Sequence, residues 1–355
     1  MIAPEGADTP LRALVLTAGL GTRLAPLTYI RAKAAVPVNG DTLARRVIRW
    51  LVSERIRDLV LNLHHLPASI AASVGDGSDL GARIRYSWEN PVLGSAGGPR
   101  RALPLLVDVF PPDSAPRMPD PGLRIPHPGA RTPDPGRFLI VNGDTLTNVS
   151  IAAMLSAHVA SGAAVTLALI PNPRPDKYGG VIVSKKQWVT GFTRAGAAQP
   201  SYHFIGVQIA ERRAFESLTD GVPAETVNDL YPRMIAADAR SVGAYVCGAS
   251  FRDIGTPTDY LETCIQLGEA EGDCLAAGTR VDIHPTATVA RTAIWDDVTI
   301  GAAAELVECI VCDGAVIPAA AHYQRCAILQ AAGRSPRGRE RVEGHLLIRS
   351  LGEGD

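Results

Sequence analysis

The chain carries, from residue 11 to residue 28, the stretch LRALVLTAGLGTRLAPLT. Leu11–Thr17 is an apolar run with a β-branched centre, which predicts a parallel strand buried on both faces. Gly19 and Gly21 break the run, so the strand is expected to end in a glycine-rich turn whose backbone N–H groups can approach an anion closely. Arg23 and Lys33 supply the positive charge that such an anion needs. The stretch therefore predicts a phosphate-binding loop.

The two glycines allow two other interpretations. A plain tight turn with surface basic residues explains two glycines equally well when they are taken alone. A dinucleotide-binding turn needs the pattern Gly-x-Gly-x-x-Gly, but Leu24 stands where the third glycine belongs. A hydride-transfer cofactor is therefore not expected.

Length and composition describe a globular chain with more than one domain. It has 355 residues, of which 46% are hydrophobic and 20% charged, and a net charge of −1. This balance argues against a sequence-independent nucleic-acid partner, because such proteins rely on a basic excess. The apolar run Leu14–Leu20 is too short to span a membrane, and the N-terminal residues lack the basic start of a secretion signal. We expect a cytoplasmic protein with neither a nucleic-acid nor a membrane partner.

Strand-like and helix-like segments alternate through the first 110 residues. Apolar positions from Leu43 to Val52 follow a helical stripe, and Leu59–Leu63 has the pattern of the next strand. This alternation predicts an α/β domain with a mostly parallel sheet covered by helices. Thr256 and Pro257 have the character of a helix start, and Gly272 that of its end, so the domain is expected to extend over residues 1–272.

Two other regions have a different texture. Pro111–Gly136 holds nine of the 27 prolines and is expected to be an extended insertion, because proline can join neither a helix nor a central strand. Between residues 279 and 330, apolar residues recur every six positions, with a one-residue slip; they are Ile283 and Val289, then Ile294, Ile300, Leu306 and Cys312. A hexapeptide period predicts a short, left-handed parallel β-helix, whose sides also offer a surface for homo-oligomer formation. Residues 331–355, with the basic segment Arg334–Arg341, are expected to be a solvated tail.

Taken together, these segments resemble the sugar-phosphate nucleotidyltransferase family, whose signature is G-x-G-T-R-L-x-P-L-T followed by a P-K-P element. Gly19–Thr28 matches the signature, whereas Ala32-Lys33-Ala34 keeps the lysine of the second element and lacks both prolines. Other matching segments follow in the family's order over most of residues 11–270; they are Gly75–Ser78, Leu93–Gly98, Val141–Asp144 and Asp253–Pro257. The pattern is most similar to that of mannose-1-phosphate guanylyltransferases. The resemblance implies a Rossmann-like nucleotidyltransferase domain followed by the β-helix.

The resemblance also assigns roles to residues of this chain. It implies that the nucleotide is bound by two segments, which comprise Ala18, Gly19, Gly21, Thr22, Arg23 and Lys33, then Gly94, Ser95, Ala96 and Gly97. It implies sugar contacts at Gly143 and at the Tyr178–Gly179 turn. The family's E-K-P element, which supplies a sugar-binding glutamate and a phosphate-binding lysine, is missing here, and Arg194 is the candidate replacement for that lysine.

Two aspartates are candidate ligands for Mg²⁺. Asp144 follows the expected strand Phe138–Val141, at the end where parallel sheets bind ligands, and Asp253 precedes a helix. Taken singly, the first could be a turn residue and the second an acid placed by the helix dipole. With a phosphate loop upstream, we favour a pair of carboxylates that hold Mg²⁺ together with substrate phosphates.

The expected reaction joins a nucleoside triphosphate to a sugar 1-phosphate and releases pyrophosphate. Arg23, Lys33 and Asp144 are the expected catalytic residues, acting by positioning and charge neutralisation. GTP and mannose 1-phosphate are the expected pair. A heptose, glucose or N-acetylmuramic acid 1-phosphate with GTP, UTP or dTTP stays open, and so does a regulatory homologue that binds a nucleotide-sugar without turnover.

Overall fold

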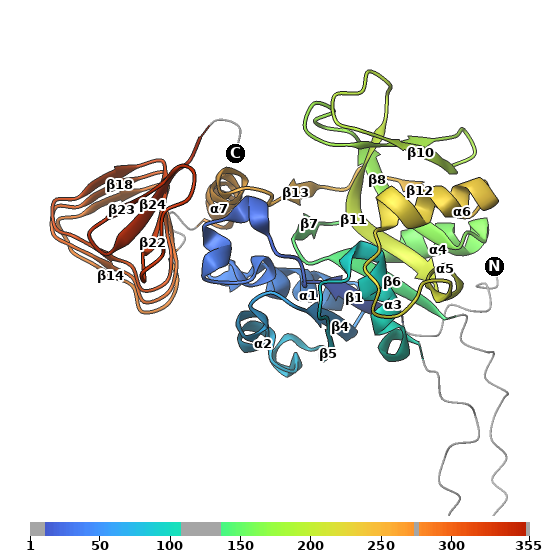
Figure 1. Cartoon of the computed structure of the whole chain (residues 1–355), viewed down its shortest axis with the longest axis horizontal. Coiled ribbons are helices and arrows are strands. Elements are labelled where there is room, and N and C mark those ends of the chain that lie inside the picture. The colour runs from blue at the N-terminus through green and yellow to red at the C-terminus, as the bar shows by residue number, and fades with distance from the viewer. Residues whose placement is uncertain (1–10, 108–135, 273–276, 353–355) are drawn as a thin grey trace, which may run out of the picture.

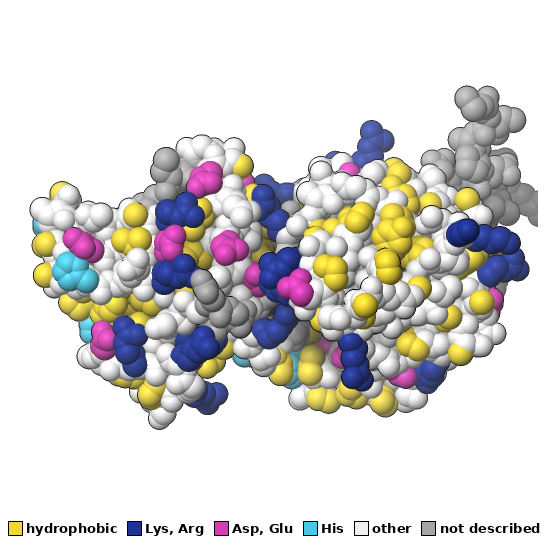
Figure 2. Space-filling view, turned by 90° about the horizontal axis from the view of Figure 1, so that it is seen from above, with side chains coloured by type: hydrophobic (Ala, Val, Ile, Leu, Met, Phe, Trp, Pro, Cys, Tyr) yellow, Lys and Arg dark blue, Asp and Glu magenta, His cyan; other side chains and the backbone are white. Residues whose placement is uncertain are grey.

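The computed structural model describes residues 11–107, 136–272 and 277–352, which form two lobes. Figure 1 shows a larger lobe built on a central sheet and a smaller lobe of short strands near the C-terminus, with helix α7 (Pro257–Glu271) between them. Charged side chains of both signs gather where the two lobes meet (Figure 2). The predicted insertion at 111–136 lies, apart from Gly136, outside the described residues.

The larger lobe is organised around a nine-stranded sheet whose main path runs β10-β9-β11-β6-β1-β4-β5. Strand β1 pairs in parallel with both β4 and β6, and β5 continues the parallel set on the far side of β4. Strand β11 is antiparallel to β6, and β8 and β12 extend the sheet beside it. The bounds are β1 Arg12–Leu16, β4 Asp58–Leu63, β5 Arg83–Trp88, β6 Arg137–Asn142, β8 Val165–Pro171, β9 Gly180–Val183, β10 Val189–Thr193, β11 Tyr202–Glu211 and β12 Val242–Val246.

Helices cover both faces of this sheet, so β1 is buried on each side. Ala13 and Val15 of β1 face one core cluster, whereas Leu14 faces the other. The first cluster includes residues of α1, α2 and α4, and the second includes residues of α3, α5 and α6. The bounds are α1 Leu43–Ser53, α2 Pro67–Val74, α3 Gly94–Leu106, α4 Ile151–Ser161, α5 Arg213–Glu216 and α6 Tyr231–Ala237. The prediction of an α/β fold with a Rossmann-like sheet is confirmed.

Helix α7 begins and ends at the residues that the sequence indicates. The Thr256 hydroxyl accepts a hydrogen bond from the Asp259 N–H, and the Asp259 carboxylate accepts one from the Thr256 N–H, which forms a capping box. Pro257 occupies the first turn, where its missing N–H costs no hydrogen bond. Gly272 ends the helix with a φ of 77°, in the left-handed region that suits glycine.

The smaller lobe is a coil with three sides, each a parallel sheet. Successive turns of the coil are 17 residues apart, as in the bond from the Cys309 N–H to Thr292 Oγ1. The sheets are β14-β17-β20, β15-β18-β21 and β16-β19-β22, an arrangement consistent with a parallel β-helix. The bounds are β14 Asp282–Ile283, β15 Thr288–Ala290, β16 Ala293–Ile294, β17 Thr299–Ile300, β18 Glu305–Val307, β19 Ile310–Val311, β20 Val316–Ile317, β21 His322–Gln324 and β22 Cys326–Gln330.

The structure corrects one position of the predicted hexapeptide period. Val311, not Cys312, packs inside the coil with Ile300 and Leu306. Cys312 lies in a different cluster, with Tyr260 of helix α7. The one-residue slip therefore recurs at this corner of the coil, because each turn has two long sides and one short side.

The prediction of a tail over residues 331–355 is wrong for its last strand. Strand β24 (Leu346–Ser350) pairs antiparallel with β22 and with β23 (Glu340–Glu343), so it extends the sheet of the coil. Leu346 and Ile348 face the interior of the coil, and Leu347 faces the cluster shared with helix α7. An apolar run that covers both faces of a sheet is stable only when it is buried. The basic segment before it is mostly exposed, as expected.

None of the helices within residues 11–107, 136–272 and 277–352 has the length and hydropathy of a membrane-spanning segment.

Candidate functional site

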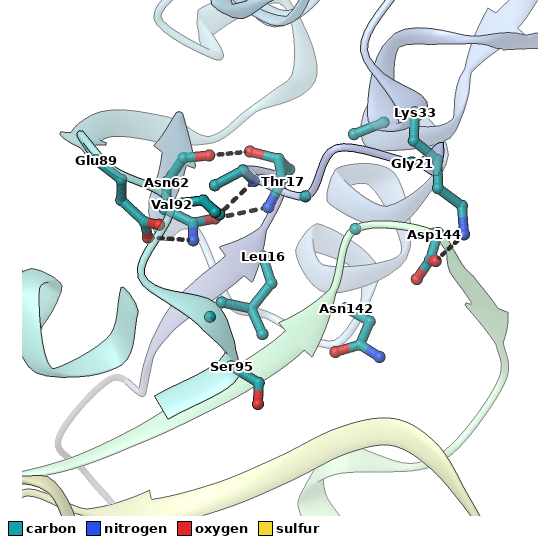
Figure 3. A pocket seen from close by; sticks show the side chains of 15 residues that line it. Leu16, Thr17, Gly21, Lys33, Asn62, Glu89, Val92, Ser95, Asn142 and Asp144 are labelled. Atoms are coloured by element: carbon teal, nitrogen blue, oxygen red, sulfur yellow. Dashed lines mark hydrogen bonds and ion pairs between the residues drawn. The ribbon is translucent and has the colours of Figure 1, made fainter. Parts of the chain in front are cut away.

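A pocket lies at the carboxyl ends of β1, β4 and β6, where open α/β sheets bind their ligands (Figure 3). The glycine-rich loop after β1 forms one wall, and the residues after β6 form another. Of the residues that the sequence singles out, the pocket is lined by Ala18, Gly19, Gly21, Lys33, Gly94, Ser95, Gly143 and Asp144. Thr22 and Arg23 are exposed on the turn beside it. The structure thus brings together segments that are more than a hundred residues apart in the chain.

Gly21 holds the glycine-rich loop in a shape that other residues resist. Its φ of 60° is in the left-handed region, and a Cβ there would lie 2.8 Å from Thr28 Cγ2 and 3.2 Å from Lys33 Cβ. Its carbonyl accepts bonds from the Leu24 N–H (2.9 Å) and from Thr28 Oγ1 (3.1 Å), which close the turn. Gly19 has open space where a Cβ would be, so the backbone on that side is accessible to a ligand.

A buried polar network of Asn62 and Glu89 supports this loop on its inner side. None of the sequence motifs includes these two residues. Asn62 Oδ1 accepts hydrogen bonds from the N–H groups of Thr17 (2.6 Å) and Ala18 (3.3 Å), while its Nδ2 donates to Glu89 Oε1 (2.7 Å). The other oxygen of the fully buried Glu89 accepts from the Leu93 N–H at 2.7 Å. The network joins the loop after β1 to the start of helix α3 (Figure 3). A glutamate just before a glycine-rich helix start was the available signal.

The start of helix α3 is packed against the segment 222–226. Ser95 Oγ donates to Glu225 Oε2 at 2.5 Å and accepts from the Thr226 N–H at 2.9 Å. The N–H groups of Ala96 and Gly97 donate to the Ala224 carbonyl at 2.9 and 3.2 Å. Ala96 and Gly97 therefore shape the helix start from behind, whereas Gly94 and Ser95 reach the pocket.

Charged side chains converge at the other end of the pocket. Lys33 Nζ forms an ion pair with Asp144 Oδ2. Asp253 ends strand β13 (Phe251–Asp253), which pairs antiparallel with β7 (Thr145–Thr147) so that Asp253 lies opposite Thr145. Burial raises the pKa of Asp253 above its usual range; the charge of Lys33 opposes this, and the negative charge of Asp144 adds to it. The two predicted metal ligands are thus neighbours in space.

Arg23 approaches this cluster from the glycine-rich loop. A Cβ on Gly255 would lie 3.1 Å from Asp253 Oδ2 and 3.3 Å from Arg23 Nη1, so both groups reach the same glycine. Among the described residues Arg23 forms no ion pair within 4 Å, and its side chain is exposed. Its guanidinium is therefore available to an anion at the mouth of the pocket.

The oxygen donors at this end suit a hard divalent cation whose coordination shell is completed by oxygen atoms of a bound ligand. Asp144 and Asp253 supply two carboxylates, which is the number with which proteins commonly hold Mg²⁺ beside substrate phosphates. Within the described part of the chain, no group of three or more His, Cys, Asp or Glu side chains could hold a metal by itself. A phosphate chain would have to supply the remaining ligands.

The region expected to contact a sugar lies next to these carboxylates. Gly143 fits tightly, since a Cβ there would lie 2.7 Å from the Leu16 carbonyl oxygen. Gly179 is held similarly against the Thr193 carbonyl oxygen, at 2.8 Å, beside the start of β9. Arg194 follows β10 and is exposed, and it does not line the pocket.

Lys177 is a cation that no motif singled out. Its Nζ donates to Asp259 Oδ1 at 2.7 Å and lies 5.4 Å from the centre of the Tyr178 ring. Burial lowers the pKa of Lys177, but the hydrogen bond with Asp259 and the charge of that carboxylate outweigh burial, and the charge of Asp253 adds to them, so the pKa lies above its usual value. Its neighbour Tyr178 packs on His203, with the ring centres 4.5 Å apart, and burial lowers the pKa of His203 to about 4. The wall beside Asp253 thus combines one cation with a stack of neutral rings.

The described geometry is that of a pocket for a phosphate chain. The glycine-rich loop lines one side of it, Lys33 and its partner Asp144 line the other end, and Arg23 and Asp253 lie beside that end. Such a site can bind a polyphosphate and neutralise its charge in a reaction at phosphorus.

Comparison with known proteins gives consistent matches. The nucleotidyl transferase family matches residues 12–111 and 129–269. A mannose-1-phosphate guanylyltransferase of Mycobacterium tuberculosis is 28% identical over 311 residues, which cover 86% of this chain and 79% of that protein. A UTP–glucose-1-phosphate uridylyltransferase of Synechocystis is 21% identical over 343 residues, covering 86% and 81%. Among solved structures, HddC from Yersinia pseudotuberculosis complexed with GMP-PN superposes with a TM-score of 0.57 at 19% identity, covering 72% and 99%.

Proposed function

Because the chain belongs to the nucleotidyl transferase family, we propose that it joins a nucleoside triphosphate to a sugar 1-phosphate and releases pyrophosphate. GTP and mannose 1-phosphate are the proposed substrates. Mannose-1-phosphate guanylyltransferases recur among the curated relatives, including those of Mycobacterium tuberculosis and Schizosaccharomyces pombe. The observation that carries the proposal is the convergence of the glycine-rich loop, Lys33 and Asp144 on one pocket.

In the proposed reaction, a phosphate oxygen of the sugar 1-phosphate attacks the α-phosphorus in line and expels pyrophosphate. The attacking phosphate is already ionised at neutral pH, so neither a general base nor a covalent intermediate is needed. Catalysis then consists of positioning and of neutralising charge on the reacting phosphates. Arg23 and Lys33 are the proposed catalytic cations, and Asp144 is the proposed catalytic carboxylate.

The proposed nucleotide contacts follow the shape of the pocket. The backbone from Gly19 to Thr22 is proposed to face the triphosphate, because the loop is open at Gly19 and fixed at Gly21, whereas the Ala18 N–H is bound to Asn62. Gly94 and Ser95 border the base and ribose, with Ala96 and Gly97 behind them. The Ser95 hydroxyl is already engaged by Glu225 and Thr226, so it holds the shape of this wall.

Proteins of this family generally use a divalent metal ion, and we assign Mg²⁺ to the carboxylates of Asp144 and Asp253. When bound, it would neutralise phosphate charge and favour attack at the α-phosphorus. Lys33 pairs with Asp144, so the phosphates of the substrate would compete with that carboxylate for the ammonium group.

The sugar is assigned to the region of Gly143, which lines the pocket, and of Gly179, both of which pack too closely on neighbouring backbone to carry a side chain. Arg194 is the proposed replacement for the missing phosphate-binding lysine. Its guanidinium is exposed, so it can swing without breaking a contact. For the smaller lobe, the parallel sheets and 17-residue turns support a parallel β-helix, and a left-handed coil is proposed from the hexapeptide period.

A matrix of triphosphates against sugar 1-phosphates, scored by pyrophosphate release, tests this function. GTP with mannose 1-phosphate is expected to give the highest kcat/KM. A preference of more than tenfold for UTP or dTTP with glucose 1-phosphate, about 1.4 kcal/mol, would contradict the substrate assignment. Absence of pyrophosphate release with every pair would favour a regulatory protein that binds nucleotide-sugars without turnover.

A further inference from the structure

Arg23 and Lys33 both lie on the connection between β1 and α1, which has little regular structure of its own. The connection contains one pair of short strands, β2 (Pro37–Val38) and β3 (Asp41–Thr42). It also contains three short 3₁₀ helices, which are η1 (Thr22–Leu24), η2 (Leu27–Tyr29) and η3 (Lys33–Ala35). Alanines flank Lys33, where prolines would stiffen the backbone. The precise placement of the two cations therefore has to come from contacts with the rest of the molecule.

The smaller lobe supplies such a contact at Arg31, two residues before Lys33. Arg31 Nε and Nη2 bind both oxygens of Asp313 at 2.7 and 2.8 Å, and Nη2 also binds Asp296 Oδ2 at 2.5 Å. The guanidinium lies 5.5 Å from the centre of the Trp295 ring. A planar fork on two carboxylates fixes orientation as well as distance, which a single ammonium group does not.

Three more bonds to the main chain or side chains of this connection surround Arg31. Arg349 Nη1 donates to the Ala25 carbonyl at 2.7 Å, and Tyr29 Oη donates to Glu340 Oε1 at 3.0 Å. From helix α7, the hydroxyl of Tyr260 donates to the Pro37 carbonyl at 2.5 Å. The part of the connection from Ala25 to Pro37 is therefore bound by the smaller lobe and by helix α7.

Apolar packing follows the same path. Leu24, Leu27 and Val36 of the connection are fully buried in one cluster with residues of the smaller lobe, namely Trp295, Ile310, Cys312, Ala327, Leu329 and Leu347. In Figure 1 the connection lies at the blue end of the colour scale, between the central sheet and the coil. One face of it borders the phosphate pocket, and the opposite face is packed against the coil.

We propose that Arg31 is a positioning residue and that the smaller lobe, through Asp296 and Asp313, holds Arg23 and Lys33 at the phosphate pocket. The coil then serves catalysis by replacing the rigidity that the missing prolines would supply. Each lobe keeps a core of its own, the larger one on both faces of its sheet and the smaller one inside the coil. Loosening the fork is therefore expected to move the connection without unfolding either lobe.

The test compares Arg31→Lys and Asp313→Asn with a matched pair on the same coil. Arg280 binds Asp297 in a similar fork, at 2.5 and 2.7 Å, but this pair is exposed and joins two turns of the coil to each other. Arg280→Lys and Asp297→Asn therefore control for loss of a fork as such. The Arg31 and Asp313 variants are expected to lose about tenfold or more in kcat/KM, mostly in kcat, since small misplacements of catalytic groups have large effects. The controls are expected to stay within about twofold of the wild type.

A second measurement needs no substrate, so it stands apart from the proposed function. Hydrogen exchange of the full chain is expected to be faster over residues 24–36 in Arg31→Lys than in Arg280→Lys, with exchange inside the coil unchanged. Unchanged exchange together with wild-type kcat would overturn the positioning role. If the wild type turned over no substrate pair, the proposed function would fail, and the exchange data would still decide whether the coil holds this connection.

Discussion

Asp253 lies opposite Thr145 in a two-stranded antiparallel sheet, and this register sets its carboxylate beside that of Asp144. The two aspartates are brought together by the short strands β7 and β13, which lie outside the main sheet. Lys33 is the cation that pairs with Asp144. The proposed chemistry depends on this small group of charges more than on any other feature.

Replacing Asp253 or Asp144 by asparagine keeps the shape of the side chain and removes one negative charge. Each change is expected to lower kcat about a hundredfold or more, because charge on the reacting phosphates loses its main counter-ion site. For Asp253→Asn the melting temperature is expected to stay unchanged or rise slightly, because a half-buried charge next to another carboxylate is removed. Steady-state kinetics at several Mg²⁺ concentrations, with thermal melting, measures both.

Asp76 provides the control for these two variants. Its carboxylate is exposed and accepts a hydrogen bond from the Ser78 N–H at 3.0 Å, in a turn that does not line the pocket. Asp76→Asn is expected to be mild. Near-normal activity of Asp253→Asn at low Mg²⁺ would refute the two-carboxylate site and leave Asp144 to act without it.

The glycine-rich loop predicts a difference between two alanine variants. Gly21 and Gly40 both have a positive φ, of 60° and 73°, so each Gly→Ala change carries backbone strain of about 1 kcal/mol. Only at Gly21 does the new Cβ also meet Thr28 and Lys33, whereas Gly40 has open space. Gly21→Ala is therefore expected to raise the KM for the triphosphate and to lower stability further. Similar kinetics for the two variants would show that the loop tolerates a side chain.

The buried network below the loop can be tested at Glu89. Both carboxylate oxygens accept hydrogen bonds, from Asn62 and from the Leu93 N–H. In Glu89→Gln the side-chain oxygen can still accept one of these two bonds, but the new NH₂ group faces the other donor and leaves it without a partner. We therefore expect a loss of about 2 kcal/mol in the free energy of unfolding and weaker nucleotide binding. Glu54 is the control, because within the described part of the chain its carboxylate accepts a single hydrogen bond, from the Ile151 N–H at 2.9 Å. Equal stability of the two glutamine variants in urea would contradict this account of the network.

Glu211 predicts a dependence of stability on pH. Burial raises its pKa, but the hydrogen bond with His158 and the charge of Arg137 outweigh burial, so the pKa lies below the usual value of 4.5. A carboxyl whose pKa is lowered by folding stabilises the protein above its unfolded pKa, and this contribution is lost as the pH falls through the folded pKa. Glu211→Gln is expected to lose about 2 kcal/mol at neutral pH.

Urea unfolding at a series of pH values measures this contribution. The difference between wild type and Glu211→Gln is expected to shrink as the pH falls from about 4.5 through the lower pKa of the folded state, because the unfolded chain binds the proton first and the folded carboxyl binds it only at the lower pH. A difference that stays constant down to the acid transition would mean that the charge of Glu211 has no part in it.

The features predictable from sequence are those encoded by neighbouring residues. The turn at Gly19 and Gly21, the N-cap at Thr256 and the position of Asp144 after a strand all depend on residues within a few positions. The family signature added Asp253, whose place opposite Thr145 is set by strand pairing over a long separation. That pairing leaves no mark in the local pattern.

The features missed by sequence depend on partners far along the chain. Arg31 and Asp313 are 282 positions apart, and neither belongs to a periodic pattern that would single it out. Asn62 and Glu89 act on backbone N–H groups, which every residue has, so their partners carry no sequence signal. The last strand was missed because three apolar residues after a basic, glycine-containing segment resemble a tail until the open edge of β22 is known.

The proposed reaction transfers the nucleotidyl group directly from the triphosphate to the sugar 1-phosphate, without a nucleotidyl-enzyme. The most direct measurement is the exchange of radiolabelled pyrophosphate into GTP, made with and without GDP-mannose. When GDP-mannose is present, we predict that labelled GTP and free mannose 1-phosphate form in equal amounts. When GDP-mannose is omitted and only unlabelled GTP is supplied with the labelled pyrophosphate, we predict that no labelled GTP forms. Labelled GTP in the absence of the nucleotide-sugar would contradict direct attack, and no label in either case would contradict the proposed enzyme.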